Sequence, residues 1–141
     1  MLFRSCNGVL TNNSTGAPSA CGGSKTVIFT YTSTCAPLSS TVQATYTVPN
    51  SPAVVLLPPA AKTTATCLTQ AAIDSDYANW LTTVTSGGGC NGNLTNNSTG
   101  APSACGGSKT VIFTYTSSCA PLSSTVRATY TVPNSDRKSV V

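Results

Sequence analysis

The string GGSKT occurs twice, at residues 22–26 and 106–110, and it resembles part of a phosphate-binding loop. Such a loop requires a Lys directly after its last Gly, and a helix must follow it so that the backbone amides can hold the phosphates. Here Ser108 separates Gly107 from Lys109, and an alternating, strand-like run follows. We therefore expect the two glycines to form a turn before a strand, and no nucleotide site.

Acid–base and metal chemistry have few side chains available. The chain has no His and only three acidic residues, all of them Asp. On a helix, Asp74 and Asp76 would point about 200° apart, so they could not share one proton-transfer task. They could contribute to a calcium site with loop carbonyls, although two carboxylates are few for that ion. We predict no catalytic, cofactor-binding or metal-binding residues, and hence no enzyme.

Positive charge is also too dispersed to indicate a nucleic-acid partner. The formal net charge is +4, but the basic residues are scattered singly apart from Arg137 and Lys138. A nucleic-acid-binding surface gathers such residues on one face. The apolar run at 52–61, PAVVLLPPAA, is too short to cross a bilayer and contains three prolines, so no membrane insertion is expected.

Seven cysteines in 141 residues point to an oxidising compartment. Zinc would require closely spaced cysteine pairs or histidines, and neither is present. We therefore expect an extracellular or cell-surface location. The N-terminal MLFRSC lacks the apolar stretch of a signal peptide, so the chain is interpreted as a fragment whose export signal lies outside it.

About a third of the chain, residues 90–135, is an internal copy of residues 6–51. Residues 6–51 match residues 90–135 at a period of 84, and only Val9/Asn93, Thr34/Ser118 and Gln43/Arg127 differ. A fixed period is typical of a tandem array. It predicts a truncated C-terminal part of a repeat at 1–51, a complete repeat module at 52–135, and a disordered tail at 136–141. Serial copies suit stalks, fibres and multivalent binders, because reach and avidity grow with copy number.

Two periodicities identify the elements of the module. In 109–117 and 124–132, apolar residues alternate with Thr and other polar residues, which predicts two antiparallel strands with one face on a core. In 69–84, Ile73, Tyr77, Trp80, Leu81 and Val84 recur at helical spacing. We expect this helix to pack its aromatic side chains onto the sheet rather than to present them to a ligand.

The strand prediction restricts how the cysteines pair. A strand of about nine residues spans roughly 30 Å, so Cys105 and Cys119 should not be joined. The NNSTG centre of 91–104 can reverse the chain, which predicts Cys90–Cys105 and, by repetition, Cys6–Cys21. One further bond remains, and it is either Cys67–Cys119, with the partner of Cys35 outside this chain, or Cys35–Cys67.

The order of motifs resembles a known family. The segment CLTQAAIDSDYANWLTTVTSGGGCNG, followed by APSACGGSKTVIFTYTSSC and ATYTV, is similar to the four-cysteine HYR-like repeats of surface and adhesin-type proteins of Bacteroidetes. This resemblance implies an all-β fold, an Ig-like β-sandwich tandem repeat with one short inserted helix at about 69–84. It also places Cys67 at the head of its own module, which favours Cys67–Cys119.

The resemblance implies a structural or adhesive extracellular module without catalysis. Its partners would be neighbouring repeats, and surface glycans or proteins. The alternative is a carbohydrate-binding module, which an exposed Trp or Tyr patch would favour, whereas buried rings beneath Thr-rich faces would favour the structural role. In this bacterial setting, the sequon asparagines are interpreted mostly as turn residues: Asn12, Asn13, Asn93, Asn96 and Asn97.

Overall fold

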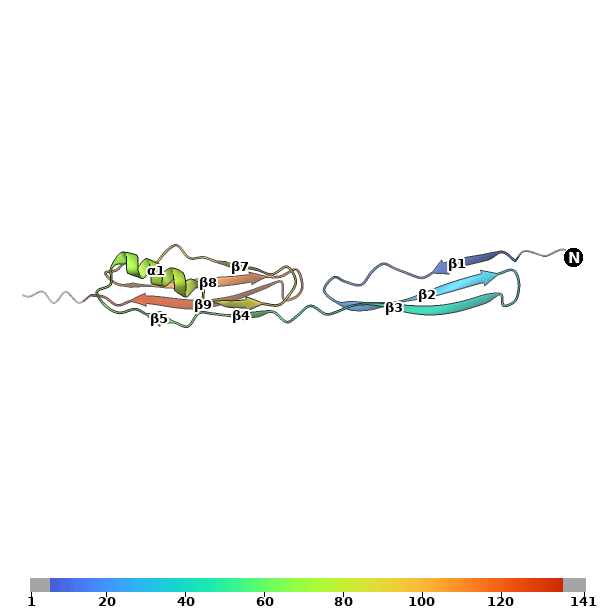
Figure 1. The fold of residues 1–141 in the computed structure, drawn as a ribbon, viewed down its shortest axis with the longest axis horizontal. Coiled ribbons are helices and arrows are strands. Elements are labelled where there is room, and N and C mark those ends of the chain that lie inside the picture. The colour runs from blue at the N-terminus through green and yellow to red at the C-terminus, as the bar shows by residue number, and fades with distance from the viewer. Residues whose placement is uncertain (1–5, 136–141) are drawn as a thin grey trace, which may run out of the picture. The chain divides into compact units, whose positions relative to one another are not determined.

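The computed structural model describes residues 6–135 and divides the chain into two compact units, Met1–Ser51 and Pro52–Val141 (Figure 1). The boundary falls at the position where the two sequence copies diverge. The tail predicted to be disordered, 136–141, lies outside the described residues.

The first unit is a three-stranded antiparallel sheet. Its strands are β1 (Gly8–Asn12), β2 (Gly23–Ser33) and β3 (Ser39–Val48), in the order β1-β2-β3. Strand β2 is central, and Val27 of β2 faces Ala44 of β3 in the register. Both long strands have the alternation that favours a pleated backbone with two different faces.

The second unit repeats this sheet and adds to it. Strands β7 (Asn93–Asn96), β8 (Gly107–Thr116) and β9 (Ser123–Val132) pair as β1, β2 and β3 do, with Val111 facing Ala128. A short strand, β5 (Lys62–Thr63), pairs in parallel with the free edge of β9. Two further short strands, β4 (Val55–Leu57) and β6 (Thr85–Gly87), form a separate antiparallel pair.

The helix α1 (Gln70–Leu81) lies within the segment predicted to be helical. It begins where the Thr69 side chain accepts a hydrogen bond from the Ala72 amide, which satisfies one of the unpaired donors of the first turn. Ile73, Tyr77 and Trp80 are buried, and Leu81 and Val84 pack partly against the same core. The predicted apolar stripe is therefore confirmed.

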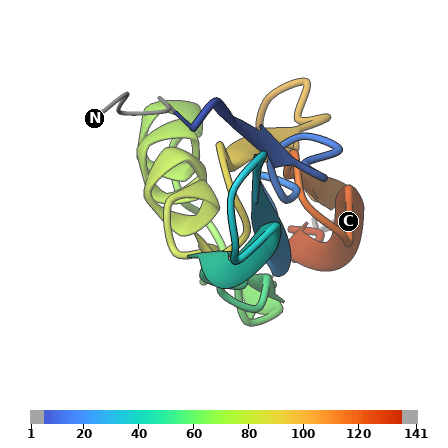
Figure 2. The ribbon, with the colours of Figure 1, turned by 90° about the vertical axis from the view of Figure 1, so that its right-hand side faces the viewer.

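The core of the second unit lies between α1 and the inner face of β8 and β9. Val111, Phe113, Ala128, Tyr130 and Val132 are its buried strand residues. The ring of Tyr130 meets Tyr77 edge-on, with centroids 5.1 Å apart, and lies 5.4 Å from the ring of Trp80. Figure 2 shows α1, in yellow-green, to one side of β9, in orange-red, within the second unit. The all-β class with one short helix is thus confirmed.

The disulfide of the first unit corrects one predicted pairing. Cys6 is bonded to Cys35, with Cα atoms 5.7 Å apart, so the predicted bond Cys6–Cys21 is wrong. It is also wrong that the partner of Cys35 lies outside the chain. The predicted turn begins only after β1, whose register pairs Gly8 with Ser33. An extended strand therefore carries Cys6 away from Cys21 and toward the far end of β2.

The pairings predicted for the second unit are also wrong. Cys67, Cys90 and Cys105 are free, which excludes Cys90–Cys105, Cys67–Cys119 and Cys35–Cys67 from this structure. Strand β7 separates Cys90 from Cys105 as β1 separates their counterparts, and the Ser118 amide donates to the Cys90 carbonyl at 2.9 Å. The free Cys105 agrees with the prediction that it does not bond Cys119.

Candidate functional site

A polar cluster that joins three elements of the second unit is centred on Asp76 of α1. Its Oδ1 lies 2.6 Å from the Lys62 Nζ of β5, and its Oδ2 accepts a hydrogen bond of 2.6 Å from the Tyr130 hydroxyl of β9. Three elements that are distant in sequence therefore meet at one carboxylate. Asp76 lies on the turn of α1 between Ile73 and Trp80, at the border of the apolar stripe.

The electrostatics of this cluster favour a structural role. Two hydrogen bonds lower the pKa of the Asp76 carboxyl below its usual value; the one from Lys62 has the larger effect and the one from Tyr130 the smaller. Burial, followed by the hydrogen bond to Asp76, raises the pKa of the Tyr130 phenol well above its usual value. Neither group changes charge near neutral pH, where a general acid or base has to titrate. The cluster can hold the helix to the strands, and its charges are poorly suited to proton transfer.

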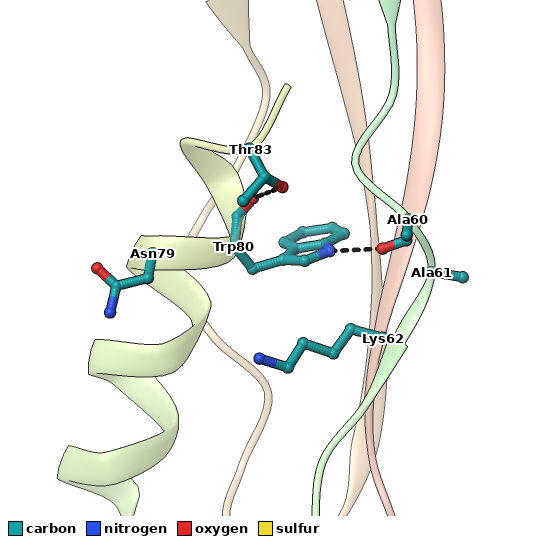
Figure 3. A pocket seen from close by; sticks show the side chains of 6 residues that line it. All are labelled: Ala60, Ala61, Lys62, Asn79, Trp80 and Thr83. Atoms are coloured by element: carbon teal, nitrogen blue, oxygen red, sulfur yellow. Dashed lines mark hydrogen bonds between the residues drawn. The ribbon is translucent and has the colours of Figure 1, made fainter. Parts of the chain in front are cut away.

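A groove of about 440 Å³ runs beside this cluster (Figure 3). It is lined by Ala60, Ala61, Lys62, Asn79, Trp80 and Thr83. The indole Nε1 of Trp80 donates to the Ala60 carbonyl at 2.8 Å, and Thr83 Oγ1 donates to the Trp80 carbonyl. Figure 3 shows the Asn79 side chain pointing away from the indole. Most polar groups of the groove are therefore occupied by the protein itself.

Sugar recognition by stacking would need an open aromatic face, and the second unit does not offer one on its helix. Trp80 is 5% exposed, and Tyr77 is also buried. The Tyr77 hydroxyl is hydrogen-bonded to Ser98 Oγ at 2.8 Å. The prediction that these rings pack the helix onto the sheet is confirmed, because both belong to the core cluster.

The outer face of the sheet carries paired hydroxyls in both units. Ser108 and Thr131 are hydrogen-bonded across the strands at 2.9 Å, and Thr110 and Thr129 at 3.0 Å. The first unit has the same pairs at its equivalent positions, at 2.8 Å and 2.9 Å. Cross-strand hydroxyl pairs of this kind contribute to sheet stability while the face stays polar.

The predicted turns are present. Gly106 and Gly107 have positive φ angles of 121° and 141°, and the GGSKT string leads into β8 rather than into a helix. The asparagine side chains cap the loop that follows β7, where Asn96 Oδ1 accepts from the Ser98 amide and Asn97 Oδ1 from the Ile112 amide. Asn12 and Asn13 make the equivalent bonds in the first unit.

The two helical carboxylates do not form a common site. Asp74 is exposed and accepts a hydrogen bond from Gln70 Nε2, whereas Asp76 faces Lys62 and Tyr130. Across residues 6–135, no three His, Cys, Asp or Glu side chains gather in a way that could hold a metal ion.

The sequence did not reveal the cluster at Asp76. A signal was available in part, because Asp76 lies three residues after Ile73 and four before Trp80, at the edge of the buried stripe. Its partners are 14 and 54 residues away, in strands whose pairing is non-local, so they could not be assigned from spacing.

Comparisons with protein-family models, with curated proteins and with solved structures give no match to this chain. In the described part of the chain, no helix combines the length and the apolar character needed to cross a membrane. The Cys6–Cys35 disulfide fits an oxidising environment such as the extracellular space.

Proposed function

We propose that this chain is part of a structural or adhesive repeat protein of the cell surface or extracellular space, and that its modules are Ig-like, of the HYR-like type, and do not catalyse a reaction. The observation that carries the proposal is that the second unit repeats the sheet of the first in the same strand order and register. A protein that lengthens by repetition benefits from copy number, whereas an enzyme gains little from serial copies of one site.

The distribution of side chains in the second unit supports a spacer rather than a ligand-binding module. The aromatic rings of α1 are buried in the core, and the outward strand positions carry paired Ser and Thr hydroxyls. The Cys6–Cys35 disulfide additionally fixes the first sheet across one end. Such a module can keep its form outside the cell with few charges on its surface.

Single-molecule stretching of the whole chain tests this role. A spacer module should resist force and then unfold cooperatively. After reduction, unfolding the 84 residues of 52–135 should release a contour length of about 300 Å, at roughly 3.6 Å per residue. In the first unit, the 29-residue separation between Cys6 and Cys35 should become extensible only after reduction. A second unit that extends without any force peak would contradict a load-bearing role.

A glycan array with the same chain tests the carbohydrate-binding alternative. At the groove of the second unit we expect no saturable binding, because the groove offers few free hydrogen-bonding groups and no open face of Trp80. The exposed aromatic rings, Tyr31 and Tyr46, lie in the first unit and are where a stacked sugar would have to bind. The groove variant Asn79→Ala serves as the control. Saturable binding of a glycan by the native chain, lost in this variant, would replace the structural role with a lectin function.

A further inference from the structure

The two sheets have nearly the same sequence, but their inner faces are covered very differently. Tyr130 is 0% exposed and Tyr115 is 7% exposed in the second unit. Their counterparts in the first unit, Tyr46 and Tyr31, are 65% and 47% exposed. Val42 on the same face of β3 is also exposed, at 66%. The first unit therefore presents an open face whose side chains form a core in the second unit.

The segment that covers the second sheet is residues 52–89, which contains β4, β5, α1 and β6. Besides its apolar side chains, it supplies hydrogen-bond acceptors for both inner tyrosines. Asp76 accepts from the Tyr130 hydroxyl at 2.6 Å, and the Gly88 carbonyl accepts from the Tyr115 hydroxyl at 2.9 Å. These contacts specify the chemistry of any segment that would cover the first sheet in the same way.

The first sheet has a hollow of about 280 Å³ where its counterpart receives the helix. It is lined by Ser14, Gly16, Ala17, Pro18, Lys25, Val27 and Tyr46. In the second unit, the counterparts of Ser14 and Pro18 are Ser98 and Pro102, and both are hydrogen-bonded to side chains of α1. Ser98 Oγ is bonded to the Tyr77 hydroxyl, and the Pro102 carbonyl accepts from Gln70 Nε2 at 3.1 Å. The hollow therefore has the polar partners as well as the apolar wall of a helix seat.

We propose that the inner face of β1, β2 and β3 is a docking site for a second copy of the helix-bearing segment, of the type of residues 52–89, supplied by a neighbouring repeat. Its helix would place an Ile, a Tyr and a Trp, at the spacing of Ile73, Tyr77 and Trp80, on the open face. Its carboxylate would accept from the Tyr46 hydroxyl. The proposal rests on the likeness of the two sheets and, for the source of the segment, on the repeat protein proposed above.

The binding of a synthetic 52–89 peptide to the whole chain tests this proposal. The peptide carries a fluorophore and the substitution Cys67→Ser, so that it forms no mixed disulfide with the free thiols of the chain. Fluorescence anisotropy should show saturable binding with one peptide per chain, because the second unit is already covered. Absence of binding at millimolar peptide would overturn the proposal.

Two chain variants locate the binding face. Tyr46→Arg should weaken binding at least tenfold, because it places a cation where the helix and its aromatic rings would pack. Gln43→Arg should leave binding unchanged, because Arg127 holds the equivalent position in the second copy and is exposed there. Equal affinity of both variants would place the peptide on another surface and refute the proposal.

Two peptide variants test the contacts without altering the chain. Trp80→Ala should weaken binding at least tenfold, since the indole is the largest side chain of the helix face, and Asp76→Asn should weaken it severalfold, because the Tyr46 hydroxyl would lose a charged acceptor. Unchanged binding of both peptides would refute the proposed docking site on the inner face of β1, β2 and β3. Sedimentation of the chain alone should show a monomer; a dimer abolished by Tyr46→Arg would identify a second copy of the sheet as the occupant, and would refute the helical segment.

Discussion

Replacing Tyr130 with Phe removes one hydroxyl from the core of the second unit. This hydroxyl donates to Asp76 Oδ2 at 2.6 Å, and the ring is fully buried. The internal repeat provides a matched control in Tyr46, which occupies the same position of β3 and is 65% exposed. The two substitutions are chemically identical and differ only in what surrounds the ring.

The expected loss follows from the type of bond. A hydrogen bond to a charged group contributes about 1.5 to 3 kcal/mol to stability, and the ring that remains leaves little cavity. Because 35% of the Asp76 side chain is exposed, we take the lower end, about 1.5 kcal/mol. With a urea dependence of about 1 kcal/mol per molar for a small unit, the unfolding midpoint should fall by roughly 1.5 M. Tyr46→Phe should leave this transition unchanged.

The fluorescence of Trp80 is the appropriate assay, because the chain has a single Trp and it lies in the core of the second unit. Urea titrations of the native chain and of both variants would then report the same cooperative transition. An unchanged midpoint for Tyr130→Phe, or equal shifts for both variants, would refute the view that Asp76 and Tyr130 join the helix to the sheet.

Further predictions concern acid, core packing and thiols. Because folding lowers the pKa of Asp76, the ionised carboxylate stabilises the second unit at pH values above its ordinary pKa of 3.8, and this stability is lost as the pH falls through the lower pKa of the folded state. In urea titrations from pH 6 to pH 2, the unfolding midpoint should therefore decline less steeply for Asp76→Asn than for the native chain. Parallel declines of the two midpoints would contradict this linkage. Phe113→Ala should lower the free energy of unfolding of the second unit, followed by Trp80 fluorescence, by about 3 to 5 kcal/mol, whereas Phe29→Ala in the first unit should leave it unchanged. Native alkylation followed by peptide mapping should modify Cys67, Cys90 and Cys105, and a non-reducing digest should contain Cys6–Cys35. Recovery of a Cys6–Cys21 peptide would instead restore the turn interpretation of the loop.

The elements with a strong local pattern were predictable from the sequence. The apolar residues of 69–84 recur with the period of a helix, and the described helix begins and ends inside that range. The alternation of 109–117 and 124–132 predicted both the strands β8 and β9 and the face of each that is buried. In each case, the residues that determine the structure lie within one short window.

The cysteine pairing was mispredicted because it depends on a strand with a weak local signal. Strand β7 is only Asn93–Asn96, and three of its four residues are Asn or Thr. Its stability comes from pairing with β8, and no pattern within the four residues predicts that pairing. Treating that stretch as part of a turn put Cys90 at the wrong end of β8. The strands β4, β5 and β6, of three, two and three residues, were not predictable for the same reason.

The repeat shows how far a strand sequence determines its own environment. Residues 23–33 and 107–117 are identical, and both form central strands in the same register. Yet Phe113 is fully buried, while its counterpart Phe29 is only partly buried. The strand sequence thus specifies pairing and the direction of each side chain, but the burial of the inner face depends on the segment that covers it. Alternation predicts which face of a strand can form a core. That face becomes part of a core only when a covering segment, such as residues 52–89, packs against it.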